Sequence, residues 1–306
     1  MKALITDGVH EIIINGLKQA GIEVDYHPKI SDAEVREIIA PYTILIVNSK
    51  ISVDKDLMDL APDLKIVGRL GSGMEIIDQD EARKRGIVCL NSPEGNRDAV
   101  AEHCVGMLLS LACNLKKSGN ELENGIWNRE SNRGWEISEK TIAIIGFGNT
   151  GSETAKRFAA LGMNVLAYDK YRSNFGAEGI REAGLEEIFE RAEVVSLHLP
   201  YTAETHHLVN KKFIEKFERP IFLINSSRGA IINTEEILTC LDQTLIRGAC
   251  LDVFESEGEE SFFLNQWNKQ LLNKDNVILS PHVAGWTVES KERLARVLYA
   301  KIMRFI

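Results

Sequence analysis

The sequence has 306 residues, of which 44% are hydrophobic, so the chain can bury a sizeable core and its length indicates two domains. Its formal net charge is -9, which argues against nucleic acid or an anionic membrane as the main partner, because both require a basic surface. The start of the chain does not resemble a signal peptide, no apolar stretch is long enough to cross a membrane, and the five cysteines show no CxxC spacing. We therefore expect a cytoplasmic location, reduced cysteines and no metal site.

Short apolar runs alternate with helix-like segments along the whole chain. In the first third they lie at 2–7, 22–27, 44–49, 65–70 and 88–92. Further along they lie at 141–148, 164–169, 194–200, 221–227, 248–253 and 276–282. Such apolar runs are typical of strands covered on both faces, and their alternation with helices predicts parallel β-α-β units. The predicted fold class is α/β with parallel sheets.

The first domain boundary is predicted near 91–98, where Pro93 and Gly95 interrupt the pattern. The next segment, 98–118, is predicted to form one helix, apolar over most of its circumference and therefore buried between domains or between subunits. Residues 289–306 form an amphipathic pattern that can return to the first domain. The expected division is a discontinuous domain of 1–96 with 286–306, and an inserted domain of 97–285. For the loop region 258–275 the sequence predicts no role.

A glycine-rich segment follows the apolar run at 141–145. Gly146, Gly148 and Gly151 form a G-x-G-x-x-G pattern between a strand and a helix, where glycines permit a tight turn and close approach of a pyrophosphate. Asp169 ends the next run, 23 residues after Gly146, where an acid can bind the adenosine ribose and repel a 2′-phosphate. The pattern predicts a dinucleotide site that prefers NAD to NADP, although Lys170 and Arg172 could soften that preference. The alternatives are an ordinary tight turn and a solvated aspartate.

Three polar residues each follow a predicted strand in the last third of the chain: Arg228, Glu257 and His282. Carboxyl ends of parallel strands share one edge with the nucleotide, so we expect the three to meet there. His282 is a candidate base, Glu257 a partner that favours its imidazolium, and Arg228 a planar cation for a substrate carboxylate. Taken singly, each has an alternative: an ion-paired turn arginine, one acid of an acidic loop, and a packed loop histidine. His206 and His207 lack such support and are interpreted as surface residues.

These segments resemble the D-isomer-specific 2-hydroxyacid dehydrogenase family, which includes phosphoglycerate dehydrogenase. The resemblance covers 67–73, 146–151, 224–237, 250–257 and 280–287, in order. It implies two Rossmann-like domains, the inserted one binding NAD and the discontinuous one binding substrate. It also implies hydride transfer between NAD and a small D-2-hydroxy or 2-keto acid, and a homodimer joined through the nucleotide domain, in agreement with the apolar helix.

The resemblance also assigns individual residues. Arg228, Glu257 and His282 become the catalytic residues. The further cofactor-binding residues are Asn149 and Thr150 under the pyrophosphate, Asp252 at the nicotinamide amide, and Ser226. The substrate carboxylate is expected on the backbone of Ser72 and Gly73, and Arg69 resembles a substrate-binding arginine of phosphoglycerate dehydrogenases. Lys50 is not assigned by the resemblance, but its long side chain could reach a phosphate group of the substrate.

Three features depart from the family pattern. Asn48 stands where phosphoglycerate-type members tend to carry arginine, and Gly258 stands where proline commonly follows the glutamate. Because the sequence ends at Ile306, we expect neither the C-terminal regulatory domain of longer phosphoglycerate dehydrogenases nor feedback by serine. Phosphoglycerate is the first-choice substrate, and glyoxylate or hydroxypyruvate is the second. A non-catalytic NAD(H)-sensing scaffold of the same fold remains an alternative; the substrate, the preferred direction and the oligomer stay open.

Overall fold

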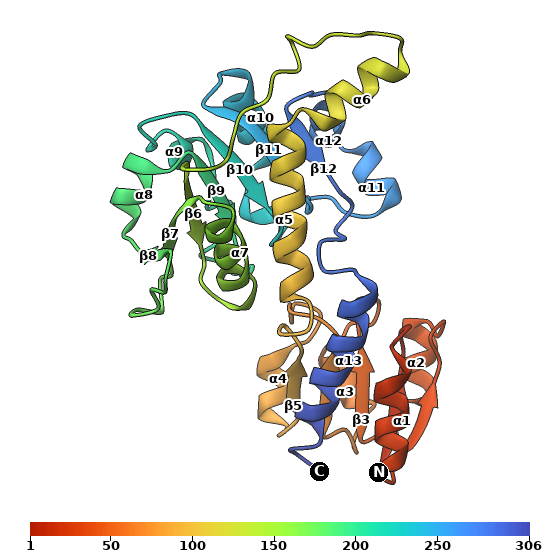
Figure 1. Cartoon of the computed structure of the whole chain (residues 1–306). Helices are drawn as coiled ribbons and strands as arrows, with labels where there is room; N and C mark the ends of the chain where they lie inside the picture. The colour runs from red at the N-terminus through yellow and green to blue at the C-terminus, as the bar shows by residue number, and fades with distance from the viewer. The chain divides into compact units, whose positions relative to one another are not determined.

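The computed structural model describes residues 1–306 and divides into two compact units. The first unit consists of Met1–Arg97 and Trp286–Ile306, and the second of Asp98–Gly285. Both ends of the chain thus belong to the first unit (Figure 1). None of the helices combines the length and the apolar character needed to cross a bilayer.

The first unit is built on a five-stranded parallel sheet with the order β2-β1-β3-β4-β5. Its strands are β1 Lys2–Ile5, β2 Glu23–Tyr26, β3 Ile44–Val47, β4 Ile66–Arg69 and β5 Val88–Asn91. Its helices are α1 Glu11–Gln19, α2 Asp32–Ile38, α3 Lys55–Asp59, α4 Gln79–Lys84 and α13 Val288–Ile302. The central strand β3 is buried at every position, as expected for a parallel strand covered on both faces.

The C-terminal helix α13 packs against α1, β4 and β5 of the first unit, although nearly 200 residues of the second unit precede it (Figure 1). The contact with α1 is close, because a Cβ at Gly16 would lie 2.8 Å from the Tyr299 ring. Thr287 begins the helix with a capping box that it shares with Ser290, which satisfies two backbone N–H groups. The amphipathic pattern near the end of the chain therefore becomes part of the core of the first unit.

The second unit is built on a seven-stranded parallel sheet with the order β12-β11-β10-β9-β6-β7-β8. Its strands are β6 Thr141–Ile145, β7 Asn164–Tyr168, β8 Ile180–Glu182, β9 Val194–Leu197, β10 Ile221–Asn225, β11 Ile246–Leu251 and β12 Val277–Leu279. Its helices are α5 Arg97–Ala112, α6 Leu115–Glu123, α7 Asn149–Ala160, α8 Leu185–Arg191, α9 Lys211–Ile214, the 3₁₀ turn η1 Gly229–Ile231, α10 Thr234–Asp242, α11 Glu259–Leu264 and α12 Gln266–Leu272. Alternate residues of β6 enter two different hydrophobic clusters: Ala143 and Ile145 one, Ile142 and Ile144 the other. A hydrophobic core therefore covers each face of the sheet.

The prediction of a single helix over 98–118 is wrong. Helix α5 ends at Ala112, and α6 begins at Leu115 after Asn114 turns into the left-handed region with φ 51°. The returning chain donates Trp135 N–H to the last α5 carbonyl, Ala112 O, at 3.0 Å. Asparagine tolerates a left-handed conformation better than most residues, so the break occurs where both the local residue and the tertiary contact favour it.

Two further differences concern segments without a predicted structure. Strand β8 extends the edge of the sheet next to β7, although 180–182 is too short to stand out as an apolar run. Residues 259–272 fold into α11 and α12. Gly258, which precedes α11, has φ 94°, a value that the ring of the family's usual proline cannot adopt. The departure from the family pattern at Gly258 therefore corresponds to a different backbone conformation.

Candidate active site

The glycine-rich turn connects the buried strand β6 to α7. Gly146 has φ 95°, and a Cβ there would lie 2.2 Å from the His198 carbonyl oxygen. A Cβ at Gly151 would lie 2.0 Å from the Gly146 carbonyl oxygen. These two positions therefore need glycine for the turn and for close helix-strand packing, in agreement with the sequence pattern.

Gly148 differs from the other two glycines because a Cβ added there would meet nothing within 4 Å. It is the N-cap residue of α7, and no side chain caps that helix. The N–H groups of the first turn, at Asn149 and Thr150, therefore lie at an uncapped helix N-terminus, where anionic groups bind favourably. The pyrophosphate of a dinucleotide needs open space next to free helix N–H groups, and Gly148 and the start of α7 provide both. The residues therefore fit NAD.

The carboxylate of Asp169 lies beside this turn. Its Oδ2 accepts the N–H of Phe147 at 2.8 Å, and its Oδ1 accepts the N–H groups of Tyr171 and Arg172 at 2.9 and 3.1 Å. A carboxylate accepts about four hydrogen bonds, so roughly one acceptor position remains for a ribose hydroxyl. Arg172 also donates to the Phe147 carbonyl, which keeps a cation at the same turn.

Arg228 lies in a turn that Asn225 organises at the end of β10. The buried Asn225 accepts the N–H of Ser227 at 3.1 Å and donates to the Arg228 carbonyl at 3.0 Å. The next residue, Gly229, lies so close to the following strand connection that a Cβ would be 1.9 Å from the Phe254 carbonyl carbon. This contact brings the Arg228 turn against the segment that leads to Glu257.

The buried Asp252 organises the loop that carries His282. Its Oδ1 accepts from Ser280 Oγ at 2.6 Å and from Val283 N–H at 2.9 Å, and its Oδ2 accepts from Ala284 N–H at 2.9 Å. The Asp252 carbonyl oxygen accepts the His282 N–H at 2.7 Å. With no exposed surface and three donors on its carboxylate, Asp252 acts mainly as a structural clamp for this loop in the structure.

Glu257 and His282 form a direct pair: the Nδ1 of His282 lies 2.8 Å from the Oε2 of Glu257. Burial works to raise the pKa of Glu257, but the hydrogen bond with His282 and the charges of His282 and Arg228 outweigh it and lower that pKa below its ordinary value. The side chain of His282 stays 46% exposed and that of Glu257 40%, so a ligand can reach both. Because Nδ1 is held by the carboxylate, Nε2 is the nitrogen that can exchange a proton with a substrate.

The first unit holds the remaining candidate residues. Arg69 ends β4, and its Nε donates to the Asn48 carbonyl at 3.1 Å. Ser72 Oγ donates to Asn96 at 3.0 Å, and Asn91 donates to the Ser72 carbonyl at 2.7 Å, which orients the backbone of Ser72 and Gly73. In contrast, Lys50 Nζ binds the Pro28 carbonyl at 2.9 Å, so the two candidate cations are engaged by different loops of this unit.

Several residues near these sites were missed in the sequence. Asp7 accepts the Asn48 N–H at 2.9 Å, His198 lies buried below the glycine-rich turn, and His103 and Cys104 of α5 contact Ser280 and Ser226. No motif marks these positions; the only available signal was a polar residue at a strand end or within an apolar helix. His207 also has a partner, Glu255, at 3.1 Å, so it is more than a solvated surface residue.

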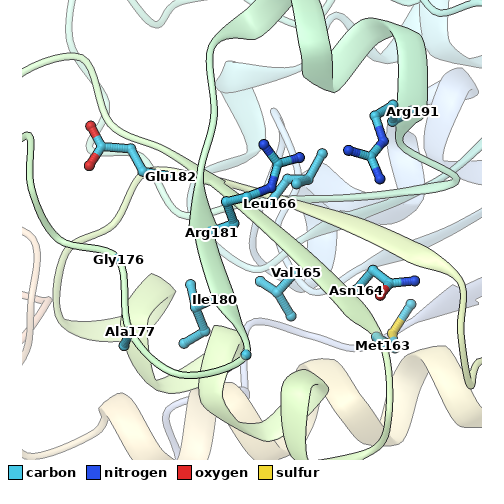
Figure 2. Close-up of a pocket in the computed structure, with 11 residues that line it drawn as sticks. Met163, Asn164, Val165, Leu166, Gly176, Ala177, Ile180, Arg181, Glu182 and Arg191 are labelled. Atoms are coloured by element: carbon cyan, nitrogen blue, oxygen red, sulfur yellow. The ribbon is translucent and has the colours of Figure 1, made fainter.

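A depression on the second unit borders β7 and β8 and contains none of the candidate site residues (Figure 2). Arg181 and Arg191 line it, but both guanidinium groups bind Glu187. The depression therefore offers no unpaired arginine for an anionic ligand, and the candidate active site lies elsewhere, at the carboxyl ends of β6, β10, β11 and β12.

Comparison with known proteins agrees with this geometry. Residues 105–284 match the D-isomer specific 2-hydroxyacid dehydrogenase, NAD binding domain. A D-3-phosphoglycerate dehydrogenase of Synechocystis sp. is 34% identical over 296 residues, 96% of this chain and 52% of the relative, so the chain spans about half the length of that protein. A hydroxypyruvate reductase of Thermotoga maritima is 32% identical over 89% of this chain and 87% of its own.

Among solved structures, a D-lactate dehydrogenase of Aquifex aeolicus complexed with NAD and lactic acid is similar over 99% of this chain and 95% of its own, with 27% identity and a TM-score of 0.83. This similarity includes both parallel sheets of the protein and the glycine-rich turn after β6. On these grounds the chain belongs to the D-isomer-specific 2-hydroxyacid dehydrogenase family, and its second unit is the NAD-binding part.

Proposed function

We propose that the protein is an NAD-dependent oxidoreductase that interconverts a small D-2-hydroxy acid and the corresponding 2-keto acid. The observation that carries the proposal is the 2.8 Å hydrogen bond between Glu257 and His282, in the loops that follow two adjacent strands, β11 and β12, of the sheet that carries the glycine-rich turn. A histidine held by a carboxylate and left with one accessible nitrogen is the arrangement that proton transfer to and from a hydroxyl requires.

The chemistry that NAD supplies when bound is acceptance of a hydride from the substrate carbon, or its donation as NADH in reverse. In oxidation, His282 Nε2 takes the proton of the substrate hydroxyl while the carbon–oxygen double bond forms. Glu257 stabilises the resulting imidazolium through Nδ1, and the lowered pKa of Glu257 keeps the carboxylate charged for this role. In reduction, the same imidazolium returns the proton to the developing alkoxide.

We propose that Arg228 binds the substrate carboxylate and polarises the carbonyl, since its planar guanidinium suits bidentate recognition. The backbone of Ser72 and Gly73, in the substrate-binding first unit, is proposed to bind the same carboxylate, and Gly146, Gly148, Asn149, Thr150, Gly151, Asp169, Ser226 and Asp252 to bind the cofactor. Because the Asp252 carboxylate has no exposed surface and already accepts three hydrogen bonds, its proposed part in cofactor binding is to hold the loop 280–284 in place.

3-Phosphoglycerate is the proposed substrate, supported by the likeness to the D-3-phosphoglycerate dehydrogenase of Synechocystis sp. and by Arg69 at the end of β4. A specific observation favours hydroxypyruvate or glyoxylate as the second candidate. Asn48 carries no charge, and the Lys50 ammonium is bound to the Pro28 carbonyl, which leaves fewer cations for a phosphate group.

A spectrophotometric panel tests the proposal. Purified protein is assayed at 340 nm with NAD and 3-phosphoglycerate, D-glycerate, glycolate or D-lactate, and with NADH and the corresponding keto acids. Turnover of at least one acid is expected, and its loss in His282→Asn identifies the proposed base. Folded protein that binds NADH but turns over no acid would contradict the enzyme and favour an NAD(H)-sensing scaffold.

We further propose a homodimer joined through the second unit. Trp127 is 80% exposed, and Leu115, Leu122 and Ile126 are exposed in or just after α6, an apolar set that a second copy of the chain can cover. Light scattering is expected to give twice the chain mass for the wild-type protein and the monomer mass for Trp127→Glu.

A cytoplasmic location is also proposed, since the five cysteines are free thiols, the state that the cytosol maintains.

A further inference from the structure

Two consecutive side chains of α5 reach the loops that carry the proposed catalytic residues. His103 Nε2 lies 2.8 Å from the Oγ of Ser280, two residues before His282. Cys104 Sγ lies 3.1 Å from the Oγ of Ser226, two residues before Arg228. A single helix therefore contacts both loops, at positions that no sequence motif marks.

The direction of the first contact follows from the single hydrogen of a serine hydroxyl. Ser280 Oγ lies 2.6 Å from Asp252 Oδ1, an oxygen that also accepts the Val283 N–H. The Ser280 hydrogen therefore points to the carboxylate, so Ser280 Oγ accepts its other hydrogen bond from His103 Nε2–H. A chain of donors runs from α5 through Ser280 to a fully buried carboxylate, whose Oδ1 also lies 3.5 Å from His103 Nε2.

The loop that Asp252 holds needs this support because of the backbone of His282. His282 has φ 53°, in the left-handed region that non-glycine residues rarely adopt. The hydrogen bonds of Asp252 to Ser280, Val283 and Ala284 fix the chain on both sides of that residue. Without them, the backbone can relax toward an ordinary φ, and the imidazole then leaves the position in which Glu257 holds Nδ1.

We propose that His103 and Ser280 are positioning residues: His103 orients the Ser280 hydroxyl, Ser280 orients the Asp252 carboxylate, and the carboxylate holds His282 in its strained, productive conformation. The catalytic consequence rests on the proposed function, whereas the effect on the loop does not. Neither residue exchanges a proton with substrate. Their removal therefore lowers kcat more than it changes KM.

The test uses the full chain with Ser280→Ala, His103→Leu and His103→Gln. Hydrogen exchange of the segment 280–285 is followed by mass spectrometry without substrate, and kcat and KM are measured with NADH and hydroxypyruvate, glyoxylate or 3-phosphohydroxypyruvate, whichever is reduced. Ser280→Ala and His103→Leu are expected to speed exchange and to lower kcat about 10- to 100-fold with KM changed less than about 3-fold, the scale expected for a misplaced reacting group. His103→Gln, which keeps an N–H donor, is expected to retain kcat within about 3-fold.

His206→Leu is the matched control, because it removes an exposed histidine of the same unit that lies outside this network. It is expected to leave exchange and kcat unchanged. Wild-type exchange and wild-type kcat in both Ser280→Ala and His103→Leu would overturn the inference. If the wild-type protein reduces none of the three keto acids, the kinetic measurement counts against the proposed reaction. The exchange comparison then decides the positioning role alone: faster exchange supports it, and unchanged exchange rejects it.

Discussion

The glycine-rich turn after β6 and the cluster of loops after β10, β11 and β12 lie on the same sheet but are built differently. The turn is local: Gly146, Gly148 and Gly151 lie within six residues, and the backbone leaves no room for a Cβ at Gly146 and Gly151. The cluster is assembled from distant segments, since Glu257 and His282 are 25 residues apart and His103 and Ser280 are 177 apart. A local turn can be recognised from its residue pattern, whereas a cluster of this kind depends on sheet order and packing.

Removal of the proposed base is the change with the largest expected effect on the loop cluster. His282→Asn is preferred to alanine, because asparagine tolerates the φ of 53° found at this position. It is expected to lower kcat about 10²- to 10⁴-fold, the usual contribution of general acid-base catalysis. NADH binding, measured by fluorescence titration, should stay unchanged. A variant that retains most of its kcat would remove His282 from the mechanism.

Two alanine substitutions distinguish the glycine that leaves room for the cofactor from a glycine that the fold requires. Gly148→Ala adds a methyl group where the protein has open space, so its melting temperature should stay within about 2 °C of the wild type. Its Kd for NADH is expected to rise about 10-fold or more, because the methyl group occupies that space. Gly151→Ala, the contrasting variant, places a Cβ 2.0 Å from Gly146 O and should lower the melting temperature as well. Equal melting temperatures in the two variants would contradict this distinction.

His198 links the turn to pH-dependent stability. Burial lowers its pKa to about 3, so between pH 6.5 and about 3 the unfolded chain binds a proton that the folded chain does not. Stability from this group is therefore complete above pH 6.5 and is lost as pH falls, by about 2 kcal/mol at pH 5. His198→Gln should reduce the difference in unfolding free energy between pH 7 and pH 5 by that amount in urea titrations. An undiminished difference would show that other groups cause the loss.

The smallest expected effect is on the pH profile, and it distinguishes Glu257 from the other acidic residues of its loop. Glu257→Gln removes the carboxylate charge next to Nδ1 of His282, so the acidic limb of the oxidation profile should move to lower pH. Glu259→Gln, an exposed acid two residues further along, is the matched control and should leave the limb in place. If the acidic limb lies at the same pH in Glu257→Gln and in the wild type, the hydrogen bond between Glu257 and His282 has no role in catalysis.

Much of the α/β fold could be predicted from the chain, because parallel strands buried on both faces require apolar runs such as 141–145 and 221–225. The exceptions have physical reasons. Strand β8 is only three residues long, and the break at Asn114 depends on a hydrogen bond from Trp135, which lies far along the chain. Periodicity alone therefore predicted one continuous helix where the structure has two.

The sequence by itself determined the family, the glycine-rich turn and the candidate trio, because these depend on local backbone requirements and on residues that follow strands. Only the tertiary structure decided how the site is held together. The three donors on Asp252, the contact of His103 with Ser280 and the binding of Lys50 to Pro28 are side-chain contacts between segments that are distant in sequence. No local pattern encodes them, because each depends on how whole strands and helices pack.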